Sequence, residues 1–229
     1  MATPLPDEPN AAPPASTRWE RAYQVFETPE QELQKFGRRL RSIGADRWDR
    51  HARVLEVCSG RGSGLRAWRE LGFSNVVGVD YSPALVFSSL PSVNPVIVGD
   101  ARHLPLATAS VDITVVQGGL HHLFTTRDVE LALAEMCRVL RPRGRLVIIE
   151  PWLTPFLRLV HSVCEQPLAR RLSSRVDALA TMIDEERETY ERWLHAPDEH
   201  LAVFRRYVVP QIMQRRWGKL VLVGSPRAS

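Results

Sequence analysis

The residues with the clearest chemical potential lie in one stretch, 53–65, which reads RVLEVCSGRGSGL. Its apolar residues predict a strand buried on both faces, followed by a glycine-rich turn and a helix. Glycines permit positive φ and let the backbone approach a ligand, and the first turn of a helix offers free N–H groups. The acidic residue inside the strand, Glu56, suits a ligand with a positive charge. The stretch therefore predicts a ligand site at the end of a buried strand.

A nicotinamide dinucleotide is the first ligand to consider for this turn. Its fingerprint is G-x-G-x-x-G/A, and Leu65 occupies the position of the third small residue. A carboxylate just before the turn also suits a pyrophosphate poorly. Glu56, Gly60, Gly62 and Gly64 instead match D/E-x-x-x-G-x-G-x-G, which resembles the first motif of the S-adenosylmethionine (SAM)-dependent methyltransferases.

Two further acidic residues end the next apolar runs. Asp80 follows a predicted strand at 75–79, near the spacing of ~20 residues expected between a glycine turn and a ribose-binding acid. Asp100 follows a strand at 96–98, where the family places an acid against the exocyclic amine of adenine. The resemblance implies a SAM site formed by Glu56, Gly60, Gly62, Asp80, Tyr81, Asp100, Ala101 and Gln117.

Two histidines, His121 and His122, follow the fourth predicted strand, 113–116. Ligands bind at the carboxyl edge of a parallel sheet, so either histidine could take a proton from a substrate hydroxyl. Packing under the cofactor or capping the next helix is the simpler alternative, and it stays open. Glu150 ends the fifth predicted strand, where it could contact substrate or hold a neighbouring loop.

The resemblance covers about residues 53–150. It implies an α/β fold of Rossmann-like type, with a mostly parallel seven-stranded sheet, an antiparallel last strand, helices on both faces and extra helical cover. A capping box at Thr28 predicts a helix before the first strand, which either covers the substrate site or only packs on the core. A helical insert at about 152–195 either forms a lid or enlarges the core, and a C-terminal hairpin is expected at about 204–224.

Composition and length predict one domain. The chain has 229 residues, 44% of them hydrophobic and 24% charged, and we expect a disordered tail at 1–17 and a single domain at 18–229. The net charge is +4, and the arginines of the chain are interspersed with acidic residues. This pattern disfavours nucleic acid as substrate. Acidic residues on the helical insert also disfavour a membrane-surface role.

Location and metal content follow from what the sequence lacks. The N-terminus has no signal-peptide pattern and no apolar run is long enough to span a membrane. The cysteines, Cys58, Cys137 and Cys164, have neither disulfide nor metal-ligand spacing. We expect a cytoplasmic protein without a metal, and the sequence indicates no oligomeric state.

The function implied is methyl transfer from SAM to an oxygen or carbon atom of a small molecule. The Leu104-Pro105-Leu106 segment and the Leu-Arg-Pro-x-Gly pattern ending at Gly144 resemble the quinone-biosynthesis branch, methyltransferase type 11. The loop after the fourth strand lacks the Asn/Asp-Pro-Pro-Tyr pattern of enzymes that methylate adenine in DNA. Two alternatives stay open: a SAM-binding fold with a non-methylating reaction such as a cyclisation, and a non-catalytic partner protein.

Overall fold

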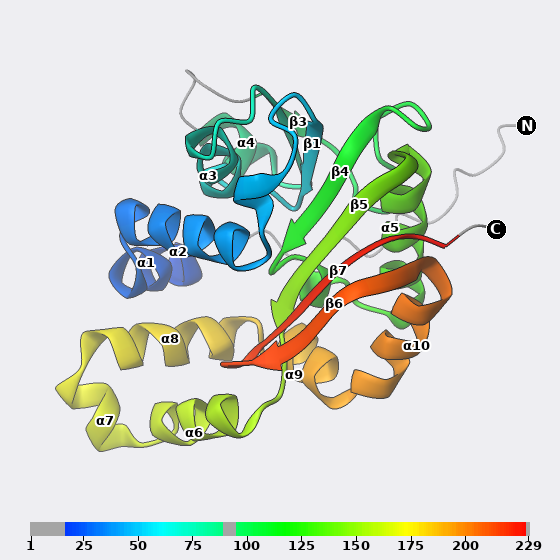
Figure 1. The fold of residues 1–229 in the computed structure, drawn as a ribbon. Coiled ribbons are helices and arrows are strands. Elements are labelled where there is room, and N and C mark those ends of the chain that lie inside the picture. The colour runs from blue at the N-terminus through cyan, green and yellow to red at the C-terminus, as the bar shows by residue number, and fades with distance from the viewer. Residues whose placement is uncertain (1–16, 89–94, 228–229) are drawn as a thin grey trace, which may run out of the picture.

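A computed structural model describes residues 17–88 and 95–227 (Figure 1). The tail expected at 1–17 lies outside the described residues except for Thr17, which begins the first helix. The helices are α1 (Thr17–Phe26), α2 (Pro29–Ser42), α3 (Ser63–Glu70), α4 (Pro83–Ser88), α5 (Thr126–Val139), α6 (Pro155–Cys164), α7 (Pro167–Leu172), α8 (Ser174–Glu185), α9 (Arg187–His195) and α10 (Pro197–Tyr207), with short 3₁₀ turns η1 (Ala45–Arg47) and η2 (Leu120–His122).

Seven strands form one sheet in the order β3-β2-β1-β4-β5-β7-β6. Neighbouring strands pair in parallel up to β5, and β7 is antiparallel to both β5 and β6. This arrangement confirms the predicted fold. The strands are β1 (Arg53–Val57), β2 (Asn75–Asp80), β3 (Val96–Val98), β4 (Val111–Gln117), β5 (Leu140–Pro151), β6 (Val208–Arg216) and β7 (Lys219–Pro226).

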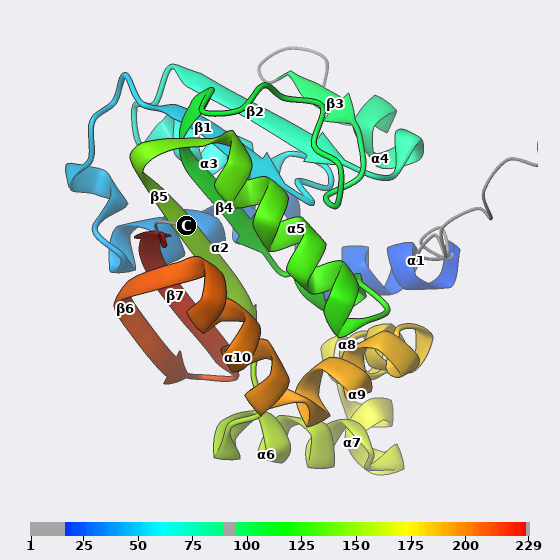
Figure 2. The same ribbon diagram turned by 90° about the vertical axis from the view of Figure 1, so that its right-hand side faces the viewer.

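Helices cover both faces of the sheet. On one face α2 and α3 bury Leu40, Leu65 and Trp68 against β1 and β4. On the other face α5 and α10 lie side by side, as Figure 2 shows, and bury Leu133 and Phe204. The strands between them are apolar on both sides, as buried parallel strands require. The predicted buried strand is confirmed, since β1 contributes Leu55 and Val57 to one side of the core and Val54 to the other.

Several boundaries differ from the sequence prediction. The helices α1 and α10 were not predicted, and the hairpin starts at Val208 rather than near 204, because the preceding residues continue α10. Helix α5 ends at Val139, and Leu140 is extended and begins β5. The helix could not continue much further, since Pro142 disfavours the helical conformation of the residue before it, Arg141.

None of the helices in the part of the chain that the structure describes combines the length and the apolar character that crossing a bilayer needs.

Candidate active site

The glycine turn is built for a close approach. Gly60 and Gly62 both have positive φ, of 52° and 82°, and Gly62 is the N-cap of α3. A Cβ on Gly64 would lie 2.0 Å from the Glu56 Oε1, so only glycine fits between the carboxylate and the first turn of α3. The predicted turn is confirmed. Glycine is needed at Gly60 and Gly62 for the positive φ, and at Gly64 for the lack of space.

Glu56 is a buried acid with an unused oxygen. Its Oε1 accepts a hydrogen bond from Gln117 Nε2 at 3.3 Å, whereas Oε2 has no partner in the described structure. Burial raises the pKa of Glu56 to about 8. Ser59 Oγ and Gln117 Oε1 are also buried without a partner. Buried polar atoms of this kind are normally satisfied, so this end of β1 fits a polar ligand with a positive charge.

Asp80 joins two loops at the carboxyl end of the sheet. Its Oδ2 accepts the Gly60 N–H at 2.7 Å, and its Oδ1 accepts the Ser82 N–H at 2.9 Å. The carboxylate therefore holds the glycine turn against the start of the next helix, while unused lone pairs can still accept from hydroxyl groups. Tyr81 follows it with 49% of its surface exposed.

Asp100 follows β3 at the carboxyl end of the sheet. Its carboxylate is bound by an arginine that the sequence analysis did not identify. Arg102 binds it through its backbone N–H at 2.8 Å and through Nη2 at 2.7 Å. The same guanidinium reaches Asp128 at 2.9 Å. Burial opposes ionisation of Asp100, but the hydrogen bonds from Arg102 outweigh it and lower the pKa. Ala101 is buried next to it.

The structure brings two of the predicted catalytic residues into direct contact. His121 Nδ1 lies 2.9 Å from Glu150 Oε2, and both side chains are buried. Glu150 Oε1 also accepts the N–H groups of Gly119 and Leu120, at 2.8 and 2.9 Å. Burial opposes ionisation of Glu150, but the bonds from His121 and from the backbone lower its pKa. The carboxylate thus fixes both the η2 turn and the imidazole.

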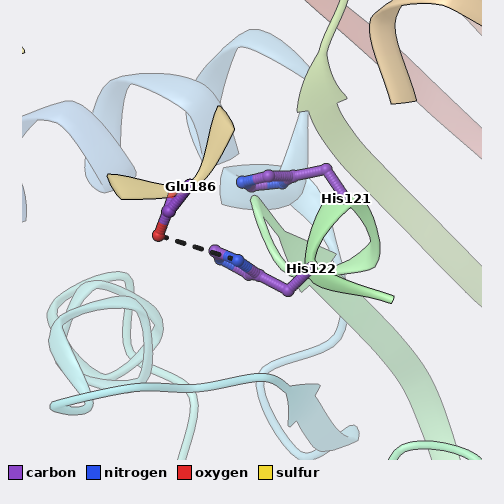
Figure 3. A group of neighbouring side chains, drawn as sticks. All are labelled: His121, His122 and Glu186. Carbon is purple, nitrogen blue, oxygen red and sulfur yellow. Dashed lines mark ion pairs between the residues drawn. The ribbon is translucent and has the colours of Figure 1, made fainter. Parts of the chain in front are cut away.

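His122 faces a third residue, which the sequence analysis missed (Figure 3). Its Nδ1 lies 3.7 Å from Oε1 of Glu186, and its ring centroid lies 4.1 Å from that of His121, with the two rings tilted by 36°. Burial, with the neighbouring His121, lowers the pKa of His122, and burial raises the pKa of Glu186. Ligand atoms of the three side chains lie within 4.8 Å of one another, so this group is where a metal ion could be held.

Two N-terminal helices cross this end of the sheet (Figure 1). Ser63 Oγ, in the first turn of α3, donates to Glu32 Oε2 of α2 at 2.7 Å, and Tyr23 of α1 also donates to Glu32. The helix α1 packs on α8 of the insert, where Arg18 pairs with Glu185 at 3.3 Å. The glycine turn is therefore covered by segments distant in sequence.

Two basic side chains, one on α2 and one on β7, have no acidic partner among the described residues. Among the described residues, the guanidinium of Arg39 and the ammonium of Lys219 form no ion pair and no hydrogen bond. Arg39 lies over the Phe36 ring at 5.5 Å. Burial, and then repulsion by Arg39, lower the pKa of Lys219 to about 7. The sequence analysis did not identify either residue.

The fold is Rossmann-like, and the glycine turn lies against a buried acid, Glu56, with an unpartnered oxygen. Comparison with known proteins identifies the class. The family described as "Methyltransferase domain" matches residues 55–148. A demethylmenaquinone methyltransferase of Mycobacterium sp. (strain KMS) is 30% identical over 195 residues, covering 78% of this chain and 80% of the relative. The chain belongs to this family of SAM-dependent methyltransferases, and SAM is its cofactor.

Other relatives match less of their length. A demethylmenaquinone methyltransferase of Mycolicibacterium vanbaalenii is 29% identical, covering 62% of this chain and 65% of the relative. The matched region thus spans less than two thirds of the first curated relatives. A crystal structure of a protein from Pyrococcus horikoshii shares the fold, with a TM-score of 0.68, 17% identity and coverage of 93% of this chain and 100% of that one.

Proposed function

We propose that this chain transfers a methyl group from SAM to an oxygen or carbon atom of a small-molecule acceptor. The observation that supports it best is the buried Glu56 carboxylate, whose free oxygen faces a glycine turn too tight for any other residue at Gly64. SAM carries positive charge, and an unpartnered buried carboxylate is stabilised by a cation. Neither the non-methylating reaction nor the non-catalytic role gains support from the relatives.

The cofactor would be held by the residues of the first three strand ends. Asp80 would accept hydrogen bonds from the ribose hydroxyls, as the family implies, and Glu56 would balance the charge of the methionine part. Gln117, through its free Oε1, could accept from the same part. For Asp100 we propose a supporting role through Ala101 and its loop, because Arg102 already occupies the carboxylate.

When bound, SAM supplies a methyl group that its sulfonium already activates. The chain must then align the accepting atom and exclude water. We propose that His121 is the base for a hydroxyl-bearing acceptor: Glu150 holds Nδ1, which leaves Nε2 to take the proton. His122 and Glu186 would border the acceptor, and the segments α1, α2 and α8 would exclude water.

The relatives' printed name points to a first acceptor to test. A demethylmenaquinone-type ring carries the oxygen and carbon positions proposed here. Loss of a proton from its reduced, hydroxylated form raises the electron density at the oxygen and at ring carbons, which makes either a better nucleophile. We also propose a reducing, cytoplasmic location, because the chain has three free cysteines.

Calorimetric titration with SAM, S-adenosylhomocysteine and NAD tests the cofactor site. Binding of both adenosyl ligands without NAD is expected, and binding of NAD alone would contradict the proposal. With a reduced demethylmenaquinone analogue, mass spectrometry should then show equal amounts of methylated product and S-adenosylhomocysteine. Product without S-adenosylhomocysteine would instead support a non-methylating reaction.

The role of His121 is tested by His121→Asn. We expect kcat to fall by ~10²–10⁴, the usual worth of a general base, with SAM affinity unchanged. The matched control is His195→Asn, since His195 is exposed and bonds only the Glu191 carbonyl. Unchanged kcat in His121→Asn would remove the base assignment and leave methyl transfer intact.

A further inference from the structure

Large exposed apolar side chains gather on α6, α7 and the tip of the β6–β7 hairpin. Leu172, Leu168, Trp217 and Leu159 are 78%, 67%, 64% and 62% exposed. Single exposed apolar residues are ordinary, but a group of this size marks an interaction surface. We call the following six residues the apolar patch: Phe156, Leu159, Val163, Leu168, Leu172 and Trp217.

The patch follows the periodicity of its two helices. Phe156, Leu159 and Val163 lie at helical spacing on α6, and Leu168 and Leu172 are four residues apart on α7. Figure 1 shows α6 and α7 at the outer border of the molecule, away from the sheet. These helices therefore present an unpartnered apolar face.

The hairpin tip extends the same surface. The Phe156 and Trp217 rings lie 5.3 Å apart at 84°, an edge-to-face contact. The backbone of Gly218 packs on Leu157 of α6. The aromatic pair therefore ties the tip to the first turn of α6, and the patch combines aromatic and aliphatic groups, as interfacial helices do.

Charge around the patch is strongly one-sided. Neither α6 nor α7 contains an acidic residue, and only Glu165 lies between them. Arg158 and Arg171 are exposed and form no ion pair among the described residues, and Arg216 lies over the Trp217 ring at 5.6 Å. Arg170, by contrast, is paired with Asp177 and Asp184 of α8.

The sequence prediction that acids on the insert disfavour a membrane surface treats the insert as one segment. Apart from Glu165, the acids of the insert lie on α8, α9 and the turn between them, whereas the exposed apolar residues lie on α6 and α7. From sequence alone the acidic and the apolar residues of the insert cannot be assigned to different surfaces, because the sequence does not show which helix faces outward. The structure separates an acidic part from an apolar part with basic flanks.

We propose that the apolar patch docks this protein on an anionic lipid bilayer. Leucine and aromatic side chains would enter the acyl–headgroup boundary, and Arg158, Arg171 and Arg216 would meet anionic headgroups. A twofold contact between two copies of this chain fits less well. It would gather the arginines of both copies in one interface, with Glu165 as the one acid that each copy contributes from α6, α7 and the turn between them.

The patch also lies close to the candidate active site. His161, on α6, is 3.2 Å from the hydroxyl of Tyr190, and the Tyr190 ring meets His121 edge-on at 5.9 Å. At helical spacing His161 lies on the face of α6 opposite Phe156, Leu159 and Val163, so α6 stands between the patch and His121. The docking itself does not depend on the proposed methyl transfer.

Vesicle sedimentation tests the proposal. The full chain is mixed with vesicles of phosphatidylcholine alone and with vesicles that also contain phosphatidylglycerol. We expect binding to the anionic vesicles that weakens in high salt. The Leu159→Asp/Leu172→Asp variant should bind at least ~10-fold more weakly, because it loses two leucine side chains that would be buried in the bilayer. The control, Val209→Asp, alters an apolar residue that is 42% exposed at the far end of β6 and should bind normally.

Circular dichroism should show all three proteins folded, because the substituted side chains are exposed. Equal binding of Leu159→Asp/Leu172→Asp and the unaltered chain would overturn the proposal, as would indifference to phosphatidylglycerol. A concentration-dependent dimer that this variant abolishes, with no vesicle binding, would overturn it too and assign the patch to self-association. Arg158→Glu/Arg171→Glu should lose the preference for anionic vesicles.

Discussion

The two sides of the candidate active site hold their charged groups in different ways. On the β1–β2 side, the Asp80 carboxylate is fixed by the backbone N–H groups of Gly60 and Ser82. On the α2–β7 side, Arg39 and Lys219 are buried enough to lower their pKa but form no ion pair among the described residues. The first side is preorganised by the chain itself, and the second is not.

We propose that this difference reflects two kinds of ligand: SAM, which is the same across the family, and the acceptor, which varies. A cofactor site shared across a family can be built from backbone groups at strand ends, whose positions the fold fixes. Side chains on covering helices and on the last strand are free to differ, so they suit the acceptor. Substitutions on the first side should act mainly on SAM, and substitutions on the second side mainly on stability and acceptor binding.

The largest expected effect is on the first side, in Asp80→Ala. The variant frees two loop N–H groups and removes the acceptor proposed for the ribose. We expect the Kd for SAM to rise by ~30-fold or more, since losing one partner of a buried charged hydrogen bond costs about 2 kcal/mol or more. Isothermal titration measures it.

Asp198→Ala is the control for that titration, because Asp198 is an exposed acid in the first turn of α10. It should bind SAM normally. If Asp80→Ala also bound SAM with unchanged affinity, the ribose assignment would be wrong and the two sides of the site would not differ as argued.

Sequence reasoning reached the first side of the site and not the second. The glycine turn, Glu56 and Asp80 follow from local patterns, and the mostly parallel sheet follows from the resemblance to a known family. Arg102, Glu186 and Glu32 were missed because their partners are chosen by packing. Glu32 meets Ser63 across a loop and a strand, and nothing local marks either residue. The contact of His121 with Glu150 joins two predicted residues whose pairing only the fold reveals.

A smaller effect is expected from Glu56→Gln, which removes a buried charge without changing shape. Burial holds the pKa of Glu56 at about 8, above the ordinary value of 4.5. The native state therefore keeps a proton that the unfolded chain loses, and stability falls as pH rises from about 4.5 to about 8. Glu56→Gln should raise Tm at pH 8.5 by ~4–8 °C, as about 2 kcal/mol does in a domain of this size.

The gain of Glu56→Gln should shrink towards acidic pH, and the affinity for SAM should fall at the same time, because the amide no longer balances a cation. Thermal scans across pH, with and without SAM, separate the two effects. A variant that is more stable and still binds SAM as tightly would show that Glu56 does not face the cofactor.

The smallest effect is expected on the second side, from Lys219→Met. Burial and Arg39 lower the pKa of Lys219 to about 7 from 10.5, so the native state releases a proton that the unfolded chain keeps. The destabilisation is full below pH 7 and disappears as pH rises towards 10.5, which is the reverse of the Glu56 profile. Lys219→Met should raise Tm at pH 6 by ~2–4 °C, and less at pH 9.

Two readouts make the Lys219→Met experiment decisive for the comparison. SAM affinity should stay unchanged, whereas KM for the acceptor should rise if the ammonium contacts it. Lys35→Met is the control, because Lys35 already pairs with Glu27 and its loss should destabilise rather than stabilise the chain. A loss of SAM affinity in Lys219→Met would instead show that Lys219 belongs to the SAM-binding side. The boundary between the SAM-binding side and the acceptor-binding side would then lie at α2.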